Sequence, residues 1–330
     1  MTVAQRREPG PVTAVAAVCG EVLAEERLRP PRLAVLRAED AARGTAYLPT
    51  LAAYFDSFGN VVRAAAVLGV HANTFRYRLR RLVEVSGLDL GDPGERLLCR
   101  LALTCPPPPA RAVAGPATTT AVAFAAAAPA TGRQLAALVA QSLRECGPVV
   151  PAGAGPFAHA TVPLTGDPVP AAAGRAVLAA AAALGVAVRA ATGPAVPAAD
   201  AAASRRLAVL ALRAGRPGVT AFEQVRTEAT FVALRDALRR VPPVDGGGVA
   251  RLAAHDAARR TAYRATLRAY LDAHGDVATA AAAVYIHPKT FRYRLRRIEE
   301  LSGLSLDDPG TRLATELELR LRRPATGPDV

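Results

Sequence analysis

One octapeptide occurs twice in the chain and limits what the chain can fold into. The sequence Thr-Phe-Arg-Tyr-Arg-Leu-Arg-Arg fills residues 74–81 and recurs unchanged at residues 290–297. The same offset holds without a gap over a longer stretch, where Asp40 matches Asp256 and Pro93 matches Pro309. Self-similarity of this kind is the signature of a repeated structural unit. We therefore expect two copies of one fold.

Each octapeptide is predicted to lie on a helix with one apolar stripe and a broad basic face. Phe75, Leu79 and Leu82 recur at i, i+4 and i+7, which places them on a single face. The remaining face carries side chains that hydrogen-bond, and they are the candidate binding residues: Asn73, Thr74, Arg76, Tyr77, Arg78, Arg80 and Arg81 in the first copy, and Lys289, Thr290, Arg292, Tyr293, Arg294, Arg296 and Arg297 in the second.

A helix with such a face suits the major groove of double-stranded DNA, where the N-terminal residues of the helix reach the base edges. Arginine can bind guanine through two hydrogen bonds and asparagine suits adenine. We expect Arg76 and Arg292 to read bases, and Arg78 and Arg81 to bind phosphate. Asn73 is replaced by Lys289, so the two copies are predicted to read similar but unequal half-sites.

The segments before and after the octapeptide have helix-turn-helix spacing. Apolar patterns predict helices from about residue 49 to the turn at Gly59, over 61–68, over 72–86 and from 93 to about 103. Asn60 and Asp92 are placed to cap two of them. His71 and His287 stand alone before the third helix, which favours capping or packing over catalysis. Tyr77 and Tyr293 remain open between DNA contact and half-buried packing.

These residues resemble a known family. The motif Val70-His71-Ala72-Asn73-Thr74-Phe75-Arg76-Tyr77-Arg78-Leu79-Arg80-Arg81, followed by Ser86-Gly87-Leu88 and Asp92-Pro93, is similar to the C-terminal helix-turn-helix of PucR/CdaR-type bacterial transcriptional regulators. The second copy matches equally well, and the core also resembles the Fis-type helix-turn-helix. The resemblance implies double-stranded DNA as a partner, a homodimer and no cofactor. Because such regulators usually place a sensor domain first, which this chain has no room for, the effector stays open.

The predicted organisation is mainly α-helical, with two Fis-like helix-turn-helix domains flanking a small α/β domain. We expect a weakly ordered N-terminal lead over 1–31, and helix-turn-helix domains over 32–105 and 249–324. Proline-rich residues 106–117 and residues 242–248 are predicted linkers. Between them, residues 118–241 alternate strands and helices, and their order is similar to a degenerate GGDEF-like, ferredoxin-like domain. No GGDEF or GGEEF sequence occurs, so nucleotide cyclase activity is not expected.

Composition narrows the functional class. The chain carries 41 basic and 28 acidic residues, a net charge of +13 that is concentrated in the octapeptides. No apolar run is long enough for a membrane span, Pro9 and Pro11 interrupt a signal-peptide core, and we expect a cytoplasmic protein without membrane contact. Isolated acids such as Asp167 suggest no catalytic pair, so we expect no enzyme. The alternative function is a dimerisation or protein-interaction module with vestigial DNA binding.

Overall fold

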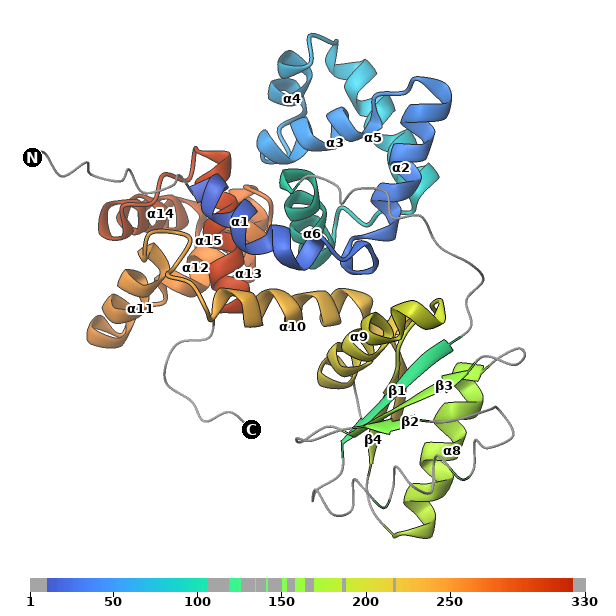
Figure 1. Cartoon of the computed structure of the whole chain (residues 1–330). Coiled ribbons are helices and arrows are strands. Elements are labelled where there is room, and N and C mark those ends of the chain that lie inside the picture. Colours follow the sequence, from blue (N-terminus) through green and yellow to red (C-terminus); the bar gives the residue numbers. More distant parts are fainter. Residues whose placement is uncertain are drawn as a thin grey trace, which may run out of the picture. The chain divides into compact units, whose positions relative to one another are not determined.

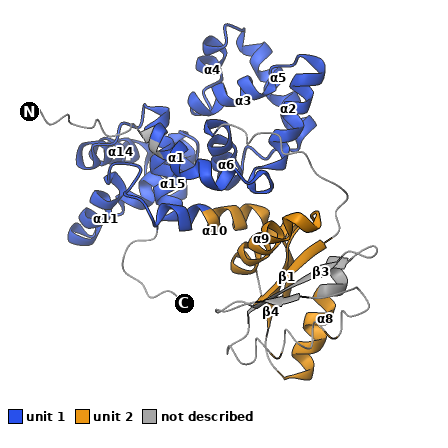
Figure 2. Ribbon diagram, viewed as in Figure 1, with its two compact units in different colours: residues 1–108, 234–330 blue, residues 109–233 orange. Residues whose placement is uncertain are grey.

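The computed structural model describes residues 11–105, 119–125, 150–152, 158–163, 169–185, 188–215 and 218–322, with the single positions 134 and 141. The chain divides into two compact units, coloured blue and orange in Figure 2. Residues 1–108 and 234–330 form the helical unit, and residues 109–233 form the central unit. The two helix-turn-helix copies, which the sequence places on either side of the central segment, therefore share one compact unit.

The helical unit contains two domains built from the same succession of helices (Figure 1). The first domain comprises α2 (Pro31–Arg43), α3 (Tyr47–Asp56), α4 (Val61–Val67), α5 (Ala72–Ser86) and α6 (Pro93–Thr104). The second comprises α11 (Gly248–Arg259), α12 (Tyr263–Asp272), α13 (Val277–Ala283), α14 (Pro288–Ser302) and α15 (Pro309–Leu321). The repeat in the sequence is thus a repeat in structure.

Side-chain caps set the limits of these helices, as the sequence predicts. The Asn60 side chain accepts a hydrogen bond from Arg63 N at the start of α4, and Asp276 does the same for Ala278 and Thr279 at α13. Asp92 caps α6 through Gly94 N and Glu95 N. Gly87 follows α5 with a left-handed φ of 66°, a conformation that costs glycine little.

The turn between α4 and α5 differs from its copy in the kind of residue that bends it. Gly69 has φ 63°, and Tyr285 at the equivalent position has φ 55°. The absence of glycine from the second copy suggested that no left-handed residue was needed, unless the turn was strained. The structure shows the strained alternative, because a left-handed backbone is unfavourable for a bulky residue. The Tyr285 side chain is 95% exposed, so packing does not compensate.

The N-terminal segment is more ordered than the expected lead. Helix α1 (Pro11–Leu23) buries Val15, Cys19 and Leu23 and contacts both α6 and α15. A short 3-10 helix, η1 (Glu26–Leu28), follows. Arg29 then fastens the segment to the end of α6, since its guanidinium donates to Ala102 O at 3.1 Å and Cys105 O at 3.3 Å. A short helix over about 12–27 was expected within this lead, but the surfaces that bury it lie far along the chain.

The expected linker over 242–248 is tied to the second domain. Val244 N donates to Glu318 Oε1 at 2.8 Å, and Val249 N donates to Asp245 Oδ2 at 2.6 Å. Helix α10 (Arg226–Leu238) runs from one compact unit into the other, because the boundary falls between residues 233 and 234. Hydrogen bonds from distant residues therefore decide which unit this stretch joins.

The central unit has a five-stranded sheet in the order β2-β3-β1-β4-β5. Its strands are β1 (Thr119–Ala125), β2 (Val150–Ala152), β3 (Ala158–Pro163), β4 (Arg189–Thr192) and β5 (Gly218–Ala221). Strand β1 pairs antiparallel with β3 and with β4, while β4 and β5 are parallel. The position of β3 between β1 and β2 is that of a split βαβ arrangement, as expected for a ferredoxin-like sheet.

Helices cover this sheet and bury its small side chains. Helix α9 (Ala201–Ala214) contacts β1 and β4, and α8 (Val169–Ala183) contacts β1, β4 and β5 (Figure 1). Ser204 of α9 accepts from Ala121 N at 2.9 Å and donates to Pro194 O at 2.8 Å. Strand β2 was not predicted. The sequence predicts a helix over 132–146, and apart from positions 134 and 141 this segment lies outside the described residues. The mainly helical fold class with a small α/β unit is confirmed, whereas the GGDEF-like resemblance stays a prediction.

Two further expectations bear on the described residues. No helix among them combines the length and apolar character that crossing a bilayer would require. Cys19, Cys99 and Cys105 are buried free thiols. Burial raises the pKa of Cys99 to about 12, so this thiol stays protonated and unreactive at neutral pH.

Candidate nucleic-acid interface

Helices α5 and α14, which carry the octapeptides, are anchored by the apolar stripe that the sequence predicts. Phe75 is fully buried against Ala64 and Ala65 of α4, and Phe291 is fully buried against Ala280 and Ala281 of α13. Small side chains on α4 and α13 let the next helix approach closely. Leu79 and Leu295 pack at the edges of the same clusters. The stripe therefore fixes which face of each helix turns outward.

Most of the candidate residues lie on that outward face. The exposed ones are Asn73, Thr74, Arg76, Tyr77, Arg80 and Arg81 on α5, and Lys289, Thr290, Arg292, Tyr293 and Arg296 on α14. Arg78, Arg294 and Arg297 are partly buried. Tyr77 and Tyr293 are 56% and 54% exposed, so about half of each side chain is open to a ligand. The arrangement presents a basic surface interrupted by two aromatic rings.

The two faces differ at the N-terminal end of the helix. Arg76 Nη1 donates to Asn73 Oδ1 at 2.8 Å, which orients the guanidinium before any ligand arrives. The second copy has Lys289 in place of Asn73, and lysine has no acceptor for Arg292. The sequence had identified this position as the main difference between the copies. The structure adds that the difference changes how freely the neighbouring arginine moves.

Other arginines on these helices already have partners. Arg81 pairs with Glu84 at 2.6 Å, and Arg297 pairs in the same way with Glu300. Arg294 Nη1 donates to Thr266 Oγ1 at 3.5 Å. The exposed pairs are worth little in water, so the guanidinium groups remain available to a phosphate. The glutamates nevertheless lower the positive charge at this end of each helix.

His71 and His287 cap the candidate helices, as their isolated positions favoured. His71 Nδ1 accepts from Asn73 N at 3.2 Å, and His287 Nδ1 accepts from Lys289 N at 3.1 Å. The ring nitrogen that accepts must be unprotonated. Each histidine therefore fixes the first turn of a candidate helix, the turn that would approach the base edges.

Reciprocal contacts join the two domains. Arg96 Nη2 donates to Asp272 O, and Arg312 Nη2 donates to Asp56 O at 2.6 Å. Arg96 and Arg312 are equivalent in the repeat, as are Asp56 and Asp272. Exchanging the two domains therefore turns one contact into the other. This is the pattern of an isologous interface, in which two copies meet through the same surface, here within a single chain.

The centre of this interface holds a buried ion pair between equivalent positions. Arg100 Nη1 lies 2.9 Å from Glu316 Oε2, and both side chains are about 5% exposed or less. Burial lowers the pKa of Arg100 and raises the pKa of Glu316, while each charge offsets the other's shift in part. An identical pair could not form here, since two arginines or two glutamates would repel each other. The repeat therefore had to diverge at this position.

A second pair of equivalent positions meets beside it. The ring centroids of Phe58 and His274 are 4.8 Å apart, and the ring planes meet at 64°. Gly59, which follows Phe58, lies against the His274 ring, and Gly275, which follows His274, lies against the Phe58 ring. A Cβ on Gly59 would lie 2.8 Å from His274 Cδ2, and one on Gly275 would lie 2.6 Å from Phe58 Cδ1. Both glycines are thus required for the close approach. Sequence reasoning did not identify Phe58 and His274 as interface residues, although the two positions are equivalent in the repeat.

The buried His274 ring predicts a pH-dependent stability. Its pKa is lowered to about 3, chiefly by burial and then by the charges of Arg96, Arg100 and Arg312. In the unfolded chain the pKa is about 6.5. Between these values the unfolded chain takes up a proton that the folded chain does not, so stability falls as the pH falls. From pH 7 to pH 5 this group removes about 2 kcal/mol from the unfolding free energy.

The measurement compares the wild type with His274→Phe, which introduces the residue found at the equivalent position 58. Urea unfolding at pH 7 and pH 5 should show a drop about 2 kcal/mol smaller for the variant. His274→Leu has a smaller side chain and should remove the same pH dependence, which separates titration from packing. Equal pH dependence in all three proteins would show that His274 does not titrate on unfolding.

Comparison with known proteins adds the family of these domains. Residues 47–105 and residues 263–321 each match the PucR C-terminal helix-turn-helix domain. The chain carries this domain twice. Each match runs from the start of α3 or α12 to the end of α6 or α15. Both include the helix that carries the octapeptide, which is α5 in the first PucR-type domain and α14 in the second.

Curated relatives share one such domain with this chain. This chain is 43% identical over 58 residues to the purine catabolism regulatory protein of Bacillus subtilis. The matched stretch covers 18% of this chain and 11% of that protein. The chain is 44% identical over 54 residues to the carbohydrate diacid regulator of Escherichia coli, covering 16% and 14%. The likeness spans less than a sixth of either relative, so it describes the domain and not the whole proteins.

A solved structure covers more of the chain but resembles it less. The regulator of polyketide synthase expression from Bifidobacterium adolescentis is 18% identical, with 78% of this chain and 96% of that chain covered. The TM-score is 0.30, which is too low to carry an argument about shared arrangement.

Proposed function

We propose that the protein is a sequence-specific, DNA-binding transcriptional regulator that reads DNA with both PucR-type domains. The observation that carries the proposal is the exposed basic face at the N-terminal half of α5 and α14. It is supported by a buried stripe that holds each helix in place and by the name of regulator that both curated relatives bear. Double-stranded DNA is the partner that such a face fits.

The proposed roles follow exposure and existing partners. Arg76 and Arg292 are exposed near the start of their helices and are assigned to base edges. Arg81 and Arg297, one turn further on and paired with glutamates, are assigned to phosphates. Because Asn73 orients Arg76 and no equivalent residue orients Arg292, we propose that the first domain discriminates its half-site more strictly.

In this proposal, one chain supplies two domains that bind DNA. The isologous interface within the helical unit takes the place that a subunit interface has in a dimeric regulator. A single chain would then bind one site with two unequal halves. The homodimer expected from the sequence would have two such pairs of domains. Counting the chains bound per duplex, in the experiment below, tests whether it forms.

The test is binding-site selection from random duplexes with the full chain, followed by titration of the selected duplex. We expect one preferred sequence with two related halves, one chain bound per duplex, and an affinity that falls steeply with salt, since phosphate contacts release counterions. Binding that shows no preference over random competitor would favour the alternative, a dimerisation or interaction module with vestigial DNA contacts.

A further inference from the structure

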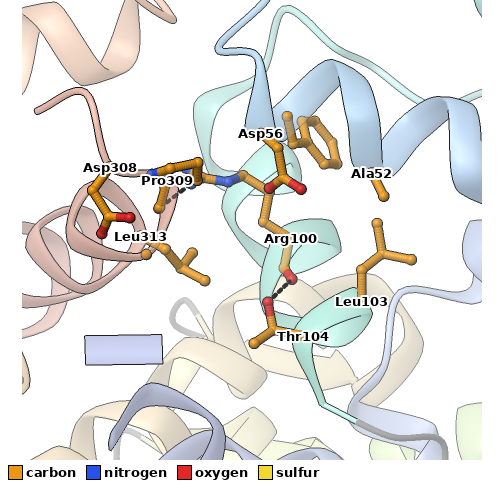
Figure 3. A pocket seen from close by; sticks show the side chains of 10 residues that line it. Ala52, Asp56, Arg100, Leu103, Thr104, Asp308, Pro309 and Leu313 are labelled. Carbon is orange, nitrogen blue, oxygen red and sulfur yellow. Dashed lines mark hydrogen bonds between the residues drawn. The ribbon is translucent and has the colours of Figure 1, made fainter. Parts of the chain in front are cut away.

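An open cavity of about 480 Å³ lies where the two PucR-type domains meet. One wall is formed by residues of α3 and α6, namely Ala52, Phe55, Asp56, Arg100, Leu103 and Thr104. The other is formed by Asp308, Pro309, Gly310 and Leu313. Figure 3 shows these residues, with the hydrogen bonds from Arg100 to Pro309 and from Thr104 to the Arg100 carbonyl drawn. The cavity combines apolar side chains with the carboxylates of Asp56 and Asp308.

The isologous interface has an equivalent location on its other side, and two arginine side chains lie there. Arg320, the equivalent of Thr104, bonds Asp272 and lies 3.4 Å from Glu316. Arg268, the equivalent of Ala52, lies 2.9 Å from Asp272. Asp272 is the equivalent of Asp56. Two guanidinium groups therefore neutralise the carboxylate on that side.

The cavity lies where these two arginines are replaced by shorter residues. Alanine and threonine are far shorter than arginine, so Ala52 and Thr104 leave space where Arg268 and Arg320 stand in the other half. Among the described residues, the exposed Asp56 carboxylate has no ion pair at contact distance, although the Arg100 guanidinium is near enough to interact with it electrostatically. The Asp308 carboxylate caps α15, accepting from Thr311 N at 2.6 Å. Asp56 is thus the carboxylate in the cavity that neither forms an ion pair nor caps a helix.

Arg100 also lines the cavity, but its charge is already matched. Its Nη1 lies 2.9 Å from Glu316, and its Nη2 donates to Pro309 O at 3.3 Å. The cavity therefore offers a carboxylate without an ion pair beside the apolar side chains of Phe55, Leu103 and Leu313. A ligand that complements it carries a positive charge at one end and a short apolar chain.

We propose that this cavity binds a small organic cation, a guanidinium or primary amine on an apolar chain, whose charged end pairs with Asp56 as Arg320 pairs with Asp272. The site is independent of DNA binding. Because its walls come from both domains, the ligand would contact both and stabilise their packing. By linkage, ligand that binds only the folded state raises the melting temperature.

The experiment titrates the full chain with n-propylguanidinium, which reproduces the arginine side chain, and follows ligand-observed NMR. The neutral n-propylurea and the anion butanoate serve as matched probes. We expect n-propylguanidinium to bind about fivefold more tightly than n-propylurea, the preference that a solvent-accessible ion pair gives. Asp56→Asn should abolish this preference, and the Asp56 backbone carbonyl that accepts from Arg312 is unchanged by it.

A second variant fills the cavity from within. Thr104→Arg restores the residue of the other half, and we expect it to block n-propylguanidinium while leaving the melting temperature the same or higher. Equal binding of the cation and the urea, tighter binding of butanoate, or undiminished preference in Asp56→Asn would each overturn the proposal. None of these readouts uses DNA, so failure of the proposed regulator function would leave them unaffected.

Discussion

Replacing both arginines that we propose to read bases, Arg76→Ala with Arg292→Ala, should abolish high-affinity binding to the selected duplex. Each arginine bound to a guanine contributes about 1–3 kcal/mol, so the double variant loses about 2–6 kcal/mol if the two half-sites act independently. Both side chains are exposed, and neither is buried in the clusters that hold α5 and α14. The folded domains should therefore survive. Fluorescence anisotropy of a labelled duplex at fixed salt measures the loss.

Each single variant should relax selection in one half of the site only. We expect the larger loss for Arg76→Ala, because Asn73 holds that guanidinium in place through a hydrogen bond of 2.8 Å. Ordering a side chain on binding costs free energy, and a side chain already ordered pays less. Repeating the site selection with each single variant shows which half has lost its sequence preference.

Two control pairs separate base reading from charge. Arg81→Ala with Arg297→Ala removes two assigned phosphate contacts, so binding should weaken on all sequences alike and the salt dependence should fall. Arg43→Ala with Arg259→Ala removes the same charge from equivalent, exposed positions outside the candidate helices and should change affinity little. If the Arg76 and Arg292 variant behaves like either control, these arginines do not read bases.

Breaking the buried ion pair between the two domains should destabilise the helical unit strongly. Glu316→Met leaves the buried Arg100 guanidinium without its ion-pair partner, at a cost of about 3–5 kcal/mol. The Pro309 carbonyl and the Asp56 carboxylate near it offset only part of that cost. The double variant Arg100→Met with Glu316→Met removes both charges, and we expect it to lie closer to the wild type than either single variant. Apolar replacement of a complete buried pair is often neutral or stabilising.

Tyrosine emission can follow this unfolding selectively. The chain has seven tyrosines and no tryptophan, and every tyrosine lies in the helical unit. Denaturant curves then report the two PucR-type domains without a signal from the central unit. As a control, Arg43→Ala breaks an exposed ion pair with Glu39 and should cost no more than about 1 kcal/mol. A cost for Glu316→Met as small as that would show that the pair is not needed at the interface.

The candidate recognition surface was predictable in detail because its determinants are local. The i, i+4, i+7 spacing of Phe75, Leu79 and Leu82 decides which face of α5 is buried, and that leaves Arg76 and Tyr77 on the opposite side. Caps such as Asn60 and Asp92 act over three residues. Local signals of this kind are read from one stretch of sequence without knowing what packs against it.

The contacts between the domains were not predictable, because each depends on residues from two distant stretches. Nothing in the sequence near Arg96 identifies the carbonyl of Asp272 as its acceptor, and Ala52 and Thr104 are unremarkable until Arg268 and Arg320 are seen filling the equivalent place. The helix at 11–23 was likewise expected to belong to a loose lead, since the α6 and α15 surfaces that bury it are remote in sequence.

The sequence by itself therefore determined that this protein contains two copies of a helix-turn-helix domain and which side chains each copy presents. Periodicity and capping are sufficient for that, because they act within a few turns of helix. Only the tertiary structure decided that the two copies pack against each other through reciprocal contacts and leave a cavity on one side. The physical reason is that burial and charge pairing depend on what each surface meets, and the repeat diverges at the positions where its copies meet.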